Sequence, residues 1–429
     1  MKASSQVGTV SMRGTATRWW MLLLISLGVI ELTLNWFNIA AAFPALGQQF
    51  RLQVPQLATL ISLFIAGYAI FHIPAGMLAY RIGVKNTLVL GLLVESLAGI
   101  ACAFAPNYGT LAALRFITGA GGSFFIGAAF ALITSWFRGR ELALAMGIAG
   151  GGAFALGETL GIAGWTGVVM AAGWSMALII AGVSGVVVSV LSFLFLRVPS
   201  EEAERLAAGN FSWLAVRRVL GNRDLWFLGL CFFGVYGMGL TTAQLLATYV
   251  GIVYHMPQSI GGLISGVFVL MSIPGSIIGG YFADRTSRLR SVIVVPWIVM
   301  GAVLALFSFL GLTGVWIMVV VAGAAQIAGF AAWTAAPGHY RDRVHPEDVA
   351  TAEGLMLTVG GLGGFVVPVI FGIIAGSSGF TLAFLFGGIV GIVFALIGFA
   401  AREPKRVSAA AQEPIASLEE AFESHPHAQ

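Results

Sequence analysis

The sequence contains very little charge. Only 9% of its 429 residues are Asp, Glu, Lys or Arg, while 58% are hydrophobic. Soluble domains carry roughly 25% charged residues, because a globular surface has to be covered with polar groups. The composition therefore excludes an ordinary soluble protein and indicates a chain whose solvent is largely lipid.

Cysteine and histidine are also scarce. The two cysteines, Cys102 and Cys231, both fall in apolar runs, so no disulfide framework is expected. His72 is the only histidine well inside an apolar run. Because transmembrane haem usually takes paired histidines on facing helices, a membrane oxidoreductase is nearly excluded and no cofactor is expected.

Long apolar runs, by contrast, are abundant. In lipid only helices and closed barrels satisfy their own backbone hydrogen bonds, and these runs are long enough for helices of about 20 residues. The first run is full-length and is followed by eleven more, unlike a cleavable signal peptide. The sequence predicts an all-α membrane protein with twelve transmembrane helices, near residues 19–43, 57–79, 86–105, 108–136, 143–172, 174–196, 226–253, 260–282, 291–311, 314–336, 351–375 and 379–400.

The basic residues predict the topology, because Lys and Arg near helix ends stay on the cytoplasmic side. With twelve helices, all but two of the 22 Lys and Arg residues lie on one side of the membrane; Arg51 lies on the other side and Arg115 inside a helix. Both termini are therefore predicted to be cytoplasmic. The net charge of +4 comes from these loops and fits an anionic lipid leaflet better than nucleic acid, so the bilayer is the expected partner.

A polar segment divides the chain into two halves. The longest interruption between apolar runs is a cytoplasmic linker at residues 199–224, with a short amphipathic helix expected around Trp213–Leu220. It separates a first six-helix bundle at residues 1–198 from a second at residues 225–402. Residues 403–429 mix Ala, Glu, Ser and His and are expected to form a flexible cytoplasmic tail.

A related segment follows the second apolar run of each half. Residues 76–85 read Gly-Met-Leu-Ala-Tyr-Arg-Ile-Gly-Val-Lys, and residues 280–288 read Gly-Tyr-Phe-Ala-Asp-Arg-Thr-Ser-Arg. Both resemble the loop signature of the major facilitator superfamily, and the run that begins with Arg115, Arg-Phe-Ile-Thr-Gly, resembles its second motif. The resemblance implies a major facilitator fold of two bundles that rock about a central site near the midplane. It also implies gating roles for the loop residues Gly76, Tyr80, Arg81, Lys85, Gly280, Asp284, Arg285 and Arg288.

The sequence departs from this family's pattern in two places. Tyr80 stands where the family has a loop aspartate, whereas Asp284 keeps it in the second half. Because the family's aspartate and arginine take part in cytoplasmic contacts between the bundles, we expect the first-half latch to be weaker or differently built. The family's drug–proton antiporters carry a Gly-Pro pair in helix five, but no proline occurs here between Pro106 and Pro199, which weakens a drug-exporter interpretation.

Glycine clusters occur in three predicted helices, at residues 119–122, 150–152 and 360–364. Small residues let helices cross closely, so we interpret these clusters mainly as packing positions. The alternative is a hinge, or a substrate that approaches bare backbone.

Four charged residues stand out well inside apolar runs: Glu31, Glu95, Arg115 and Glu158. A charge at the bilayer centre costs roughly 2.5–3.5 kcal/mol, so each needs an explanation. In the family that the chain resembles, helices one, four and five surround the central cavity. This implies that Glu31, Arg115 and Glu158 face each other there. Helix three is more peripheral, so Glu95 is the weakest candidate.

One arginine cannot neutralise three carboxylates, so the surplus acid is either protonated or occupied by a cation. The alternative role for Arg115 is a structural ion pair with one glutamate. Asn35 follows Glu31 by one turn on the same face. A lone histidine is more often a packing residue, but His72 becomes a candidate metal ligand beside such groups. The predicted substrate and proton site comprises Glu31, Asn35, His72, Arg115, Glu158 and the neutral Gln244 and Gln326, with Glu31, Glu158 and His72 as metal ligands.

An acidic cavity suits protons, metal ions or organic cations better than polyanions, and sugars remain compatible with it. Residues 31–46 and 71–76 resemble magnetosome-membrane members of the superfamily. That resemblance implies a bacterial inner or magnetosome membrane, iron as the transported ion and other magnetosome membrane proteins as partners.

The working hypothesis is therefore a secondary active, proton-linked iron transporter rather than an enzyme. In it, replacing Glu31 with Gln abolishes gradient-driven transport. The alternatives are a proton-coupled exporter of small organic cations or other solutes, and a non-transporting scaffold or sensor.

Overall fold

The computed structural model describes residues 12–137, 139–199, 213–286, 288–340, 343–345 and 348–403, and this part of the chain is helical throughout its regular elements. The first half contains α1 (Met12–Phe50), α2 (Val54–Ile70), α3 (His72–Ile82), α4 (Val84–Cys102), α5 (Tyr108–Trp136), α6 (Gly139–Met146), the π-helical η1 (Gly147–Ala153), α7 (Phe154–Thr159), the π-helical η2 (Leu160–Gly164), α8 (Trp165–Ala172) and α9 (Trp174–Phe195).

The described part of the linker forms α11 (Trp213–Leu220), where an amphipathic helix is predicted. The second half contains α12 (Arg223–Tyr254), α13 (Gln258–Leu270), α14 (Ser272–Arg285), α15 (Leu289–Leu306), the 3₁₀ turn η3 (Phe307–Phe309), α16 (Leu312–Ala328), α17 (Phe330–His339), α18 (Val349–Ser378), α19 (Phe380–Ile397) and the 3₁₀ turn η5 (Gly398–Ala400). Residues 200–212 of the linker and 404–429 of the predicted tail lie outside the described residues.

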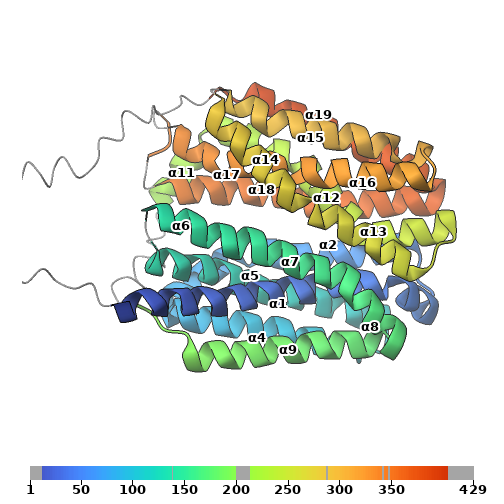
Figure 1. Ribbon diagram of the computed structural model, residues 1–429, viewed down its shortest axis with the longest axis horizontal. Helices are drawn as coiled ribbons and strands as arrows, with labels where there is room; N and C mark the ends of the chain where they lie inside the picture. The colour runs from blue at the N-terminus through green and yellow to red at the C-terminus, as the bar shows by residue number, and fades with distance from the viewer. Residues whose placement is uncertain are drawn as a thin grey trace, which may run out of the picture.

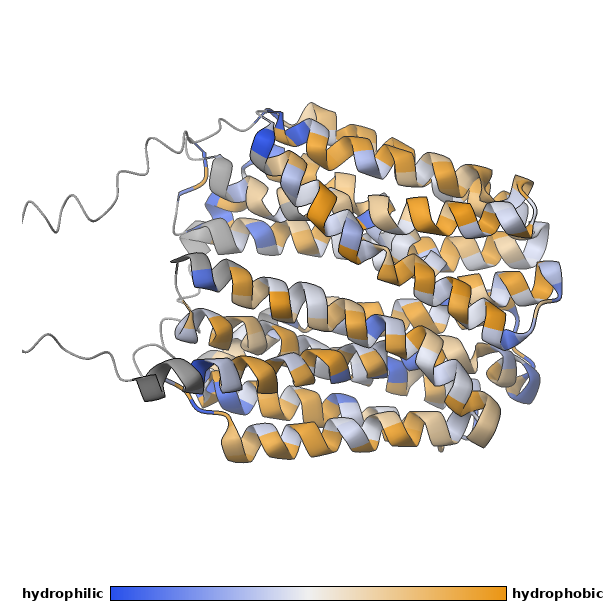
Figure 2. Cartoon of the chain, viewed as in Figure 1, coloured by the Kyte–Doolittle hydropathy of each residue, from blue (hydrophilic) through white to orange (hydrophobic). Residues whose placement is uncertain are grey.

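The predicted set of membrane-spanning helices is confirmed. Eleven described helices are long and apolar enough to cross a bilayer, and the shorter apolar helix Val54–Ile70 continues into α3 as the remaining span. Hydrophobic residues run along the length of the helices, whereas hydrophilic residues gather toward the two ends (Figure 2). This distribution matches a protein that exposes its sides to lipid and its ends to water.

The second span of each half is interrupted. The break between α2 and α3 lies at Phe71, and that between α13 and α14 lies at Met271. Pro74 and Pro274 follow each break by three residues and lack the N–H that would bond the carbonyl four residues earlier. The two breaks are 200 residues apart, whereas the loop segments that begin at Gly76 and Gly280 are 204 residues apart, so the breaks do not coincide within the repeat.

The helices form two groups that lie side by side (Figure 1). Helices α1–α9 make one group and α12–α19 the other, and both described ends of the chain lie at the same end of the molecule, here called the terminal end. An even number of spans requires this arrangement. That the terminal end is cytoplasmic stays a prediction from the basic residues.

The opposite end, here called the far end, carries a hydrogen bond between the halves. The side-chain Nε2 of Gln258 on α13 donates to the carbonyl oxygen of Ala41 on α1 over 2.6 Å. Close by, α18 packs on α2, where a Cβ added at Gly372 would be 2.6 Å from the Cβ of Ala58. The two halves are thus tightly joined at the far end.

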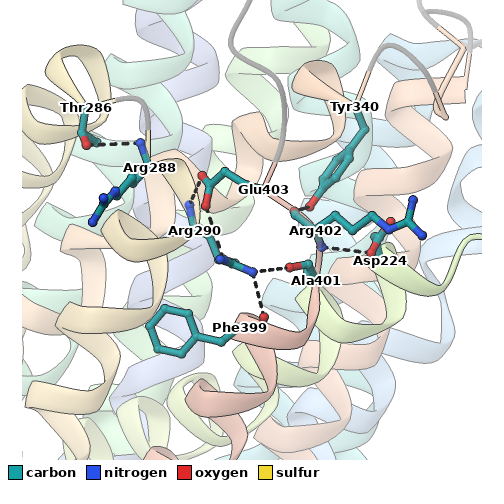
Figure 3. Close-up of polar contacts among 9 residues, drawn as sticks. All are labelled: Asp224, Thr286, Arg288, Arg290, Tyr340, Phe399, Ala401, Arg402 and Glu403. Carbon is teal, nitrogen blue, oxygen red and sulfur yellow. Dashed lines mark hydrogen bonds and ion pairs between the residues drawn. The ribbon is translucent and has the colours of Figure 1, made fainter.

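The ion pairs described at the terminal end do not join the halves. Arg18 pairs with Glu141 inside the first half, at 2.7 Å. In the second half Asp224 accepts hydrogen bonds from the Arg343 side chain and from the backbone N–H of Arg402, each at 3.1 Å. Figure 3 shows this second-half cluster, which also contains Arg290, Glu403 and Tyr340 and ties the end of α19 to α12, α15 and α17.

The glycine clusters behave in two ways. A Cβ at Gly121 would be 2.8 Å from the Cα of Glu95, and one at Gly363 would be 2.6 Å from the carbonyl carbon of Phe233. Packing is therefore confirmed for the clusters on α5 and α18. At Gly151, in the cluster of helix five, a Cβ would meet nothing within 4 Å, so this glycine has another role.

Candidate functional site

Glu158 is the predicted site residue that lies where the two halves meet. It belongs to α7, which contacts α1 of the first half and α13 of the second. Gly157 faces α1, where a Cβ would be 2.6 Å from the carbonyl oxygen of Ile30, and Thr159 faces Gly266 of α13. Successive helical residues are about 100° apart, so Glu158 points between these two contacts. We call the region where α1, α2 and α7 meet α12 and α13 the seam.

Glu158 is half-buried as a residue, and its carboxyl has no hydrogen-bond or ion-pair partner among the residues that the structure describes. Its helix is short and lies between two π-helical segments, η1 and η2. Such segments inside α-helical spans occur frequently at functional sites. An unpaired carboxyl in a span surrounded by lipid needs a proton or a bound cation, because the bare charge is costly there.

Two tyrosines from different halves accompany Glu158. Tyr236 on α12 interacts electrostatically with Glu158 and with Tyr68 on α2. The Tyr68 ring centroid is 5.1 Å from that of Trp36 and 4.6 Å from that of His72. Sequence reasoning missed both tyrosines, because a tyrosine in an apolar run is unremarkable and only the packing of α2 on α12 brings them together.

Glu31 does not face the seam. Its carboxylate accepts a hydrogen bond from the Ser184 hydroxyl on α9 at 3.0 Å, and the residue is only 8% exposed. The Asn35 amide donates to the carbonyl oxygens of Glu31, at 3.1 Å, and of Ala181 on α9, at 3.2 Å. Glu31 and Asn35 therefore share a face, as expected, but that face is turned toward α9 and away from Glu158.

Arg115 is anchored to backbone rather than to a carboxylate. Its guanidinium donates to the carbonyl oxygens of Asn35, at 3.2 Å, and Trp36, at 2.8 Å, and lies 4.8 Å from the centre of the Phe64 ring. The residue is 2% exposed. These contacts fit the structural role that was the alternative for Arg115. However, Arg115 binds the backbone of α1 and does not pair with a glutamate. It does not meet Glu158 across a cavity.

His72 begins α3 and also turns into the first half. Its Nδ1 is hydrogen-bonded to the Ser123 hydroxyl on α5. Glu31, His72 and Glu158 therefore point toward α9, α5 and the seam, which are three different directions. The structure does not bring the three predicted metal ligands together, and no group of three or more His, Cys, Asp or Glu occurs within the described residues.

The two predicted glutamines of the second half differ in position. Gln244 on α12 is fully buried, and neither atom of its amide has a partner among the described residues. It lines a small pocket in the seam, toward the far end, together with Ala41, Pro44, Thr166 and Gln258. Gln326 on α16 instead faces α12, where a Cβ at Gly239 would be 2.7 Å from its Cδ. Gln244 thus joins Glu158 at the seam, and Gln326 packs inside the second half.

The predicted gating loops make local contacts. Lys85 lies 5.7 Å from the centre of the Phe193 ring, and Arg285 lies 3.7 Å from that of Tyr281 on its own helix. The backbone N–H of Arg288 donates to the side chain of Thr286 at 3.2 Å. Arg81 is exposed, and a Cβ at Gly76 or Gly280 would meet nothing within 4 Å. The side chains of Tyr80 and Asp284 lie outside the described residues, so the altered latch stays a prediction.

Comparison with known protein families identifies this architecture. The family model described as Major Facilitator Superfamily matches residues 25–295 and 254–426. The chain belongs to the Major Facilitator Superfamily. It is therefore a multi-pass membrane transporter of this superfamily and not an enzyme.

Several relatives are similar over most of their length. A hexuronate transporter of Escherichia coli (strain K12) is 24% identical over 425 residues, which cover 92% of this chain and 96% of the relative. A probable nitrate transporter of Staphylococcus haemolyticus is 24% identical over 383 residues, covering 87% and 94%. A solved bacterial homologue of the human lysosomal transporter Spinster, in an inward-facing and occupied conformation, matches with a TM-score of 0.76 at 17% identity, covering 91% of this chain and 99% of that one. The structural match supports the superfamily fold.

Proposed function

We propose that this superfamily member is a proton-linked secondary transporter in which Glu158 binds the coupling proton at the seam. The observation that carries the proposal is the unpaired carboxyl of the half-buried Glu158 on a π-interrupted span where both halves meet. A residue in this position is reached from one side at a time when the halves rock. Proton binding there is thereby coupled to the movement of a solute.

The substrate class that we propose is a small organic anion of the sugar-acid type. The relatives named for hexuronate and for nitrate both carry anions. Arg115 is the only basic residue inside an apolar run, and its guanidinium is occupied by α1 backbone. An anion can therefore enter the seam only when Glu158 is protonated, because two like charges in low dielectric repel each other strongly. This requirement makes proton and anion move together. Tyr68, Tyr236 and Gln244 supply the polar groups that sugar hydroxyls need.

Iron is the second candidate substrate, and two observations favour it. The segments 31–46 and 71–76 resemble magnetosome-membrane transporters, and Glu158 and its neighbour Tyr236 provide oxygen donors. Oxygen donors suit hard metal ions. Against it stands the dispersal of Glu31, His72 and Glu158 in three directions. On this alternative Glu158 exchanges a proton for the metal, so the flux of protons opposes that of iron.

One transport experiment separates these functions. Purified protein is reconstituted into proteoliposomes and given radiolabelled D-glucuronate or, under anoxic conditions, ferrous iron, with and without a pH gradient. Saturable D-glucuronate uptake that rises with an inward proton gradient is the expected result. Iron uptake without D-glucuronate uptake overturns the anion assignment in favour of iron. Movement of neither solute by folded protein overturns both and favours another solute or a scaffold role.

A further inference from the structure

Glu95 is a buried acid that the proposed mechanism leaves unused. It lies on α4, is 0% exposed, and neither carboxyl oxygen has a hydrogen-bond partner among the described residues. At the crossing with α5, a Cβ at Gly121 would be only 2.4 Å from the backbone nitrogen of Glu95. Because this close contact holds α4 against α5, α4 cannot rotate to turn the Glu95 side chain out to lipid. An ionised carboxylate that is buried without a partner is strongly disfavoured. Glu95 therefore holds a proton in this conformation.

The charged groups around Glu95 leave this conclusion in place. A negative charge on Glu95 would be attracted by Arg115 on α5 and repelled by Glu31 on α1. The guanidinium of Arg115 already donates to two carbonyl oxygens of α1, and Glu31 accepts its hydrogen bond from Ser184 on α9. The remaining titratable neighbour is Tyr68 on α2. None of these groups forms an ion pair with Glu95 within the described structure.

Glu95 and Tyr68 approach each other at Gly122. A Cβ added at Gly122 would be 3.6 Å from Oε1 of Glu95, 3.5 Å from Cδ2 of Tyr68 and 2.7 Å from Cδ1 of Leu32. The carboxyl, the tyrosine ring and the leucine side chain therefore pack around the same glycine. Tyr68 in turn interacts with Tyr236, which interacts with Glu158 at the seam. Tyr68 thus lies between the buried acid and the seam.

The interior around Glu95 contains other buried polar atoms. Four neighbouring side chains of α1 and α5 have buried nitrogen or oxygen atoms without a hydrogen-bond partner among the described residues: Asn35, Trp36, Asn38 and Arg115. Buried polar groups of this kind are typically satisfied by internal water. Internal water at these atoms would give a proton on Glu95 a route toward Tyr68.

We propose that Glu95 is a second proton-binding carboxyl of this transporter, which exchanges its proton with the seam past Tyr68. In the exchange the O–H bond of the carboxyl breaks, the proton passes to a water molecule that reaches it past Tyr68, and the carboxylate is left near Arg115. No electrons are transferred. The inference rests on the proposed proton-linked function, and it adds a proton-binding group that lies behind the transport site and does not touch the solute.

The test is infrared spectroscopy of the purified full-length protein, which needs no substrate. A protonated carboxyl gives its own C=O band, which shifts when the proton is exchanged for deuterium. We expect the wild type to show such a band at neutral pH, Glu95→Gln to lose it, and Glu95→Asp to move it. The matched variants Glu31→Gln and Glu158→Gln retain it. Tyr68→Phe should slow the deuterium shift of the band several-fold.

Two results overturn the inference. If Glu95→Gln leaves every carboxyl band of the wild type in place, Glu95 is ionised. If the band is present but does not shift in deuterium oxide in the wild type, the acid is sealed and structural. Should Glu95→Gln fail to fold, the rate of the deuterium shift in Tyr68→Phe against wild type decides the question. Failure of the proteoliposomes to transport D-glucuronate leaves this band unaffected, so the two proposals fail separately.

Discussion

At the scale of single residues, two glutamates with similar sequence surroundings have different neighbours. Glu31 accepts a hydrogen bond from Ser184 and lies against α9, within the first half. Glu158 has no partner in the described structure and lies at the seam. A carboxyl can couple proton binding to transport only if it reaches the space that opens and closes. Of the two glutamates expected as proton carriers, we therefore propose Glu158 as the one that couples proton binding to transport.

The matched variants Glu158→Gln and Glu31→Gln test this assignment. We expect Glu158→Gln to lose gradient-driven accumulation of D-glucuronate but to keep exchange of solute across the membrane, because a neutral amide binds no proton. One proton per solute supports about a tenfold concentration ratio per unit of pH gradient, since 1.4 kcal/mol corresponds to a factor of ten. That ratio should fall to one. Glu31→Gln should accumulate solute like the wild type, and an inactive Glu31→Gln beside an active Glu158→Gln would reverse the assignment.

At the scale of elements, helix five combines a closely packed part with an open part. Gly157 and Gly161 let α7 and η2 lie directly on α1, where a Cβ at Gly161 would be 3.1 Å from the carbonyl oxygen of Thr33. Gly147 and Gly151 in η1 face open space instead. The first pair fixes the direction of Glu158, and the second leaves the terminal-end part of the span free to change its helical winding.

Alanine substitutions distinguish the two parts of helix five. Gly157→Ala places a methyl group 2.6 Å from the carbonyl oxygen of Ile30, so it should destabilise the protein by about 1–3 kcal/mol through overpacking. Gly147→Ala meets no atom within 4 Å and should leave stability equal or up to about 1 kcal/mol higher, because alanine favours helix. Thermal unfolding of both variants in the same detergent measures the difference. Equal midpoints would show that the α1 contact is not tight.

An ion pair helps to attach the linker helix α11 to the second half. Arg218 donates two hydrogen bonds of 2.7 Å to the carboxylate of Asp348, just before α18. These bonds hold the pKa of Asp348 below its ordinary value of 3.8. A carboxyl with a lowered pKa stabilises the docked state above its ordinary pKa and loses this contribution as the pH falls through the lowered value.

We therefore expect α11 to stay docked at neutral pH and to be released only in strong acid, below pH 3.8. Asp348→Asn should loosen α11 already at neutral pH and remove this dependence. Hydrogen exchange of residues 213–220 measures docking directly. Glu141→Gln, which breaks the ion pair with Arg18 in the first half, is the control and should leave exchange in α11 unchanged.

At the scale of the whole molecule, the halves are joined where Gln258 donates to the carbonyl oxygen of Ala41. The described ion pairs of the terminal end lie within one half or attach α11 to the second half. Within the described residues, the hydrogen bond between the halves thus lies at the far end and the ion pairs of the terminal end leave the two halves separate.

Gln258→Ala should shift the protein toward opening at the far end. A neutral hydrogen bond contributes about 0.5–1.5 kcal/mol, which corresponds to a change of roughly two- to tenfold in the ratio of the two conformations. Distances between spin labels on far-end residues of α2 and α18 report that ratio. Gln53→Ala is the control, because Gln53 lies at the same end and its described hydrogen bonds stay within the start of α2. An unchanged distance distribution in Gln258→Ala would show that the bond does not hold the far end closed.

Much of this architecture follows from local patterns. The length of the apolar runs gives the spans, and the loop segments at residues 76–85 and 280–288 indicate two related halves, because these properties depend on neighbouring residues alone. The sequence also marks Glu31, Glu95, Arg115 and Glu158 as anomalies, since the cost of a charge in lipid does not depend on which helix packs beside it.

Which of those anomalies faces the seam was decided only by the tertiary structure. The direction of a side chain depends on where its helix crosses its neighbours. These crossings are set by contacts between residues far apart in the chain, such as the packing of Gly157 of α7 against α1 and of Gly121 of α5 against α4. The same contacts turn Arg115 onto α1 backbone and bring Tyr68 beside Tyr236. Sequence by itself determined the number of spans and the residues that need a partner; packing determined which of them received one and left Glu158 open to the seam.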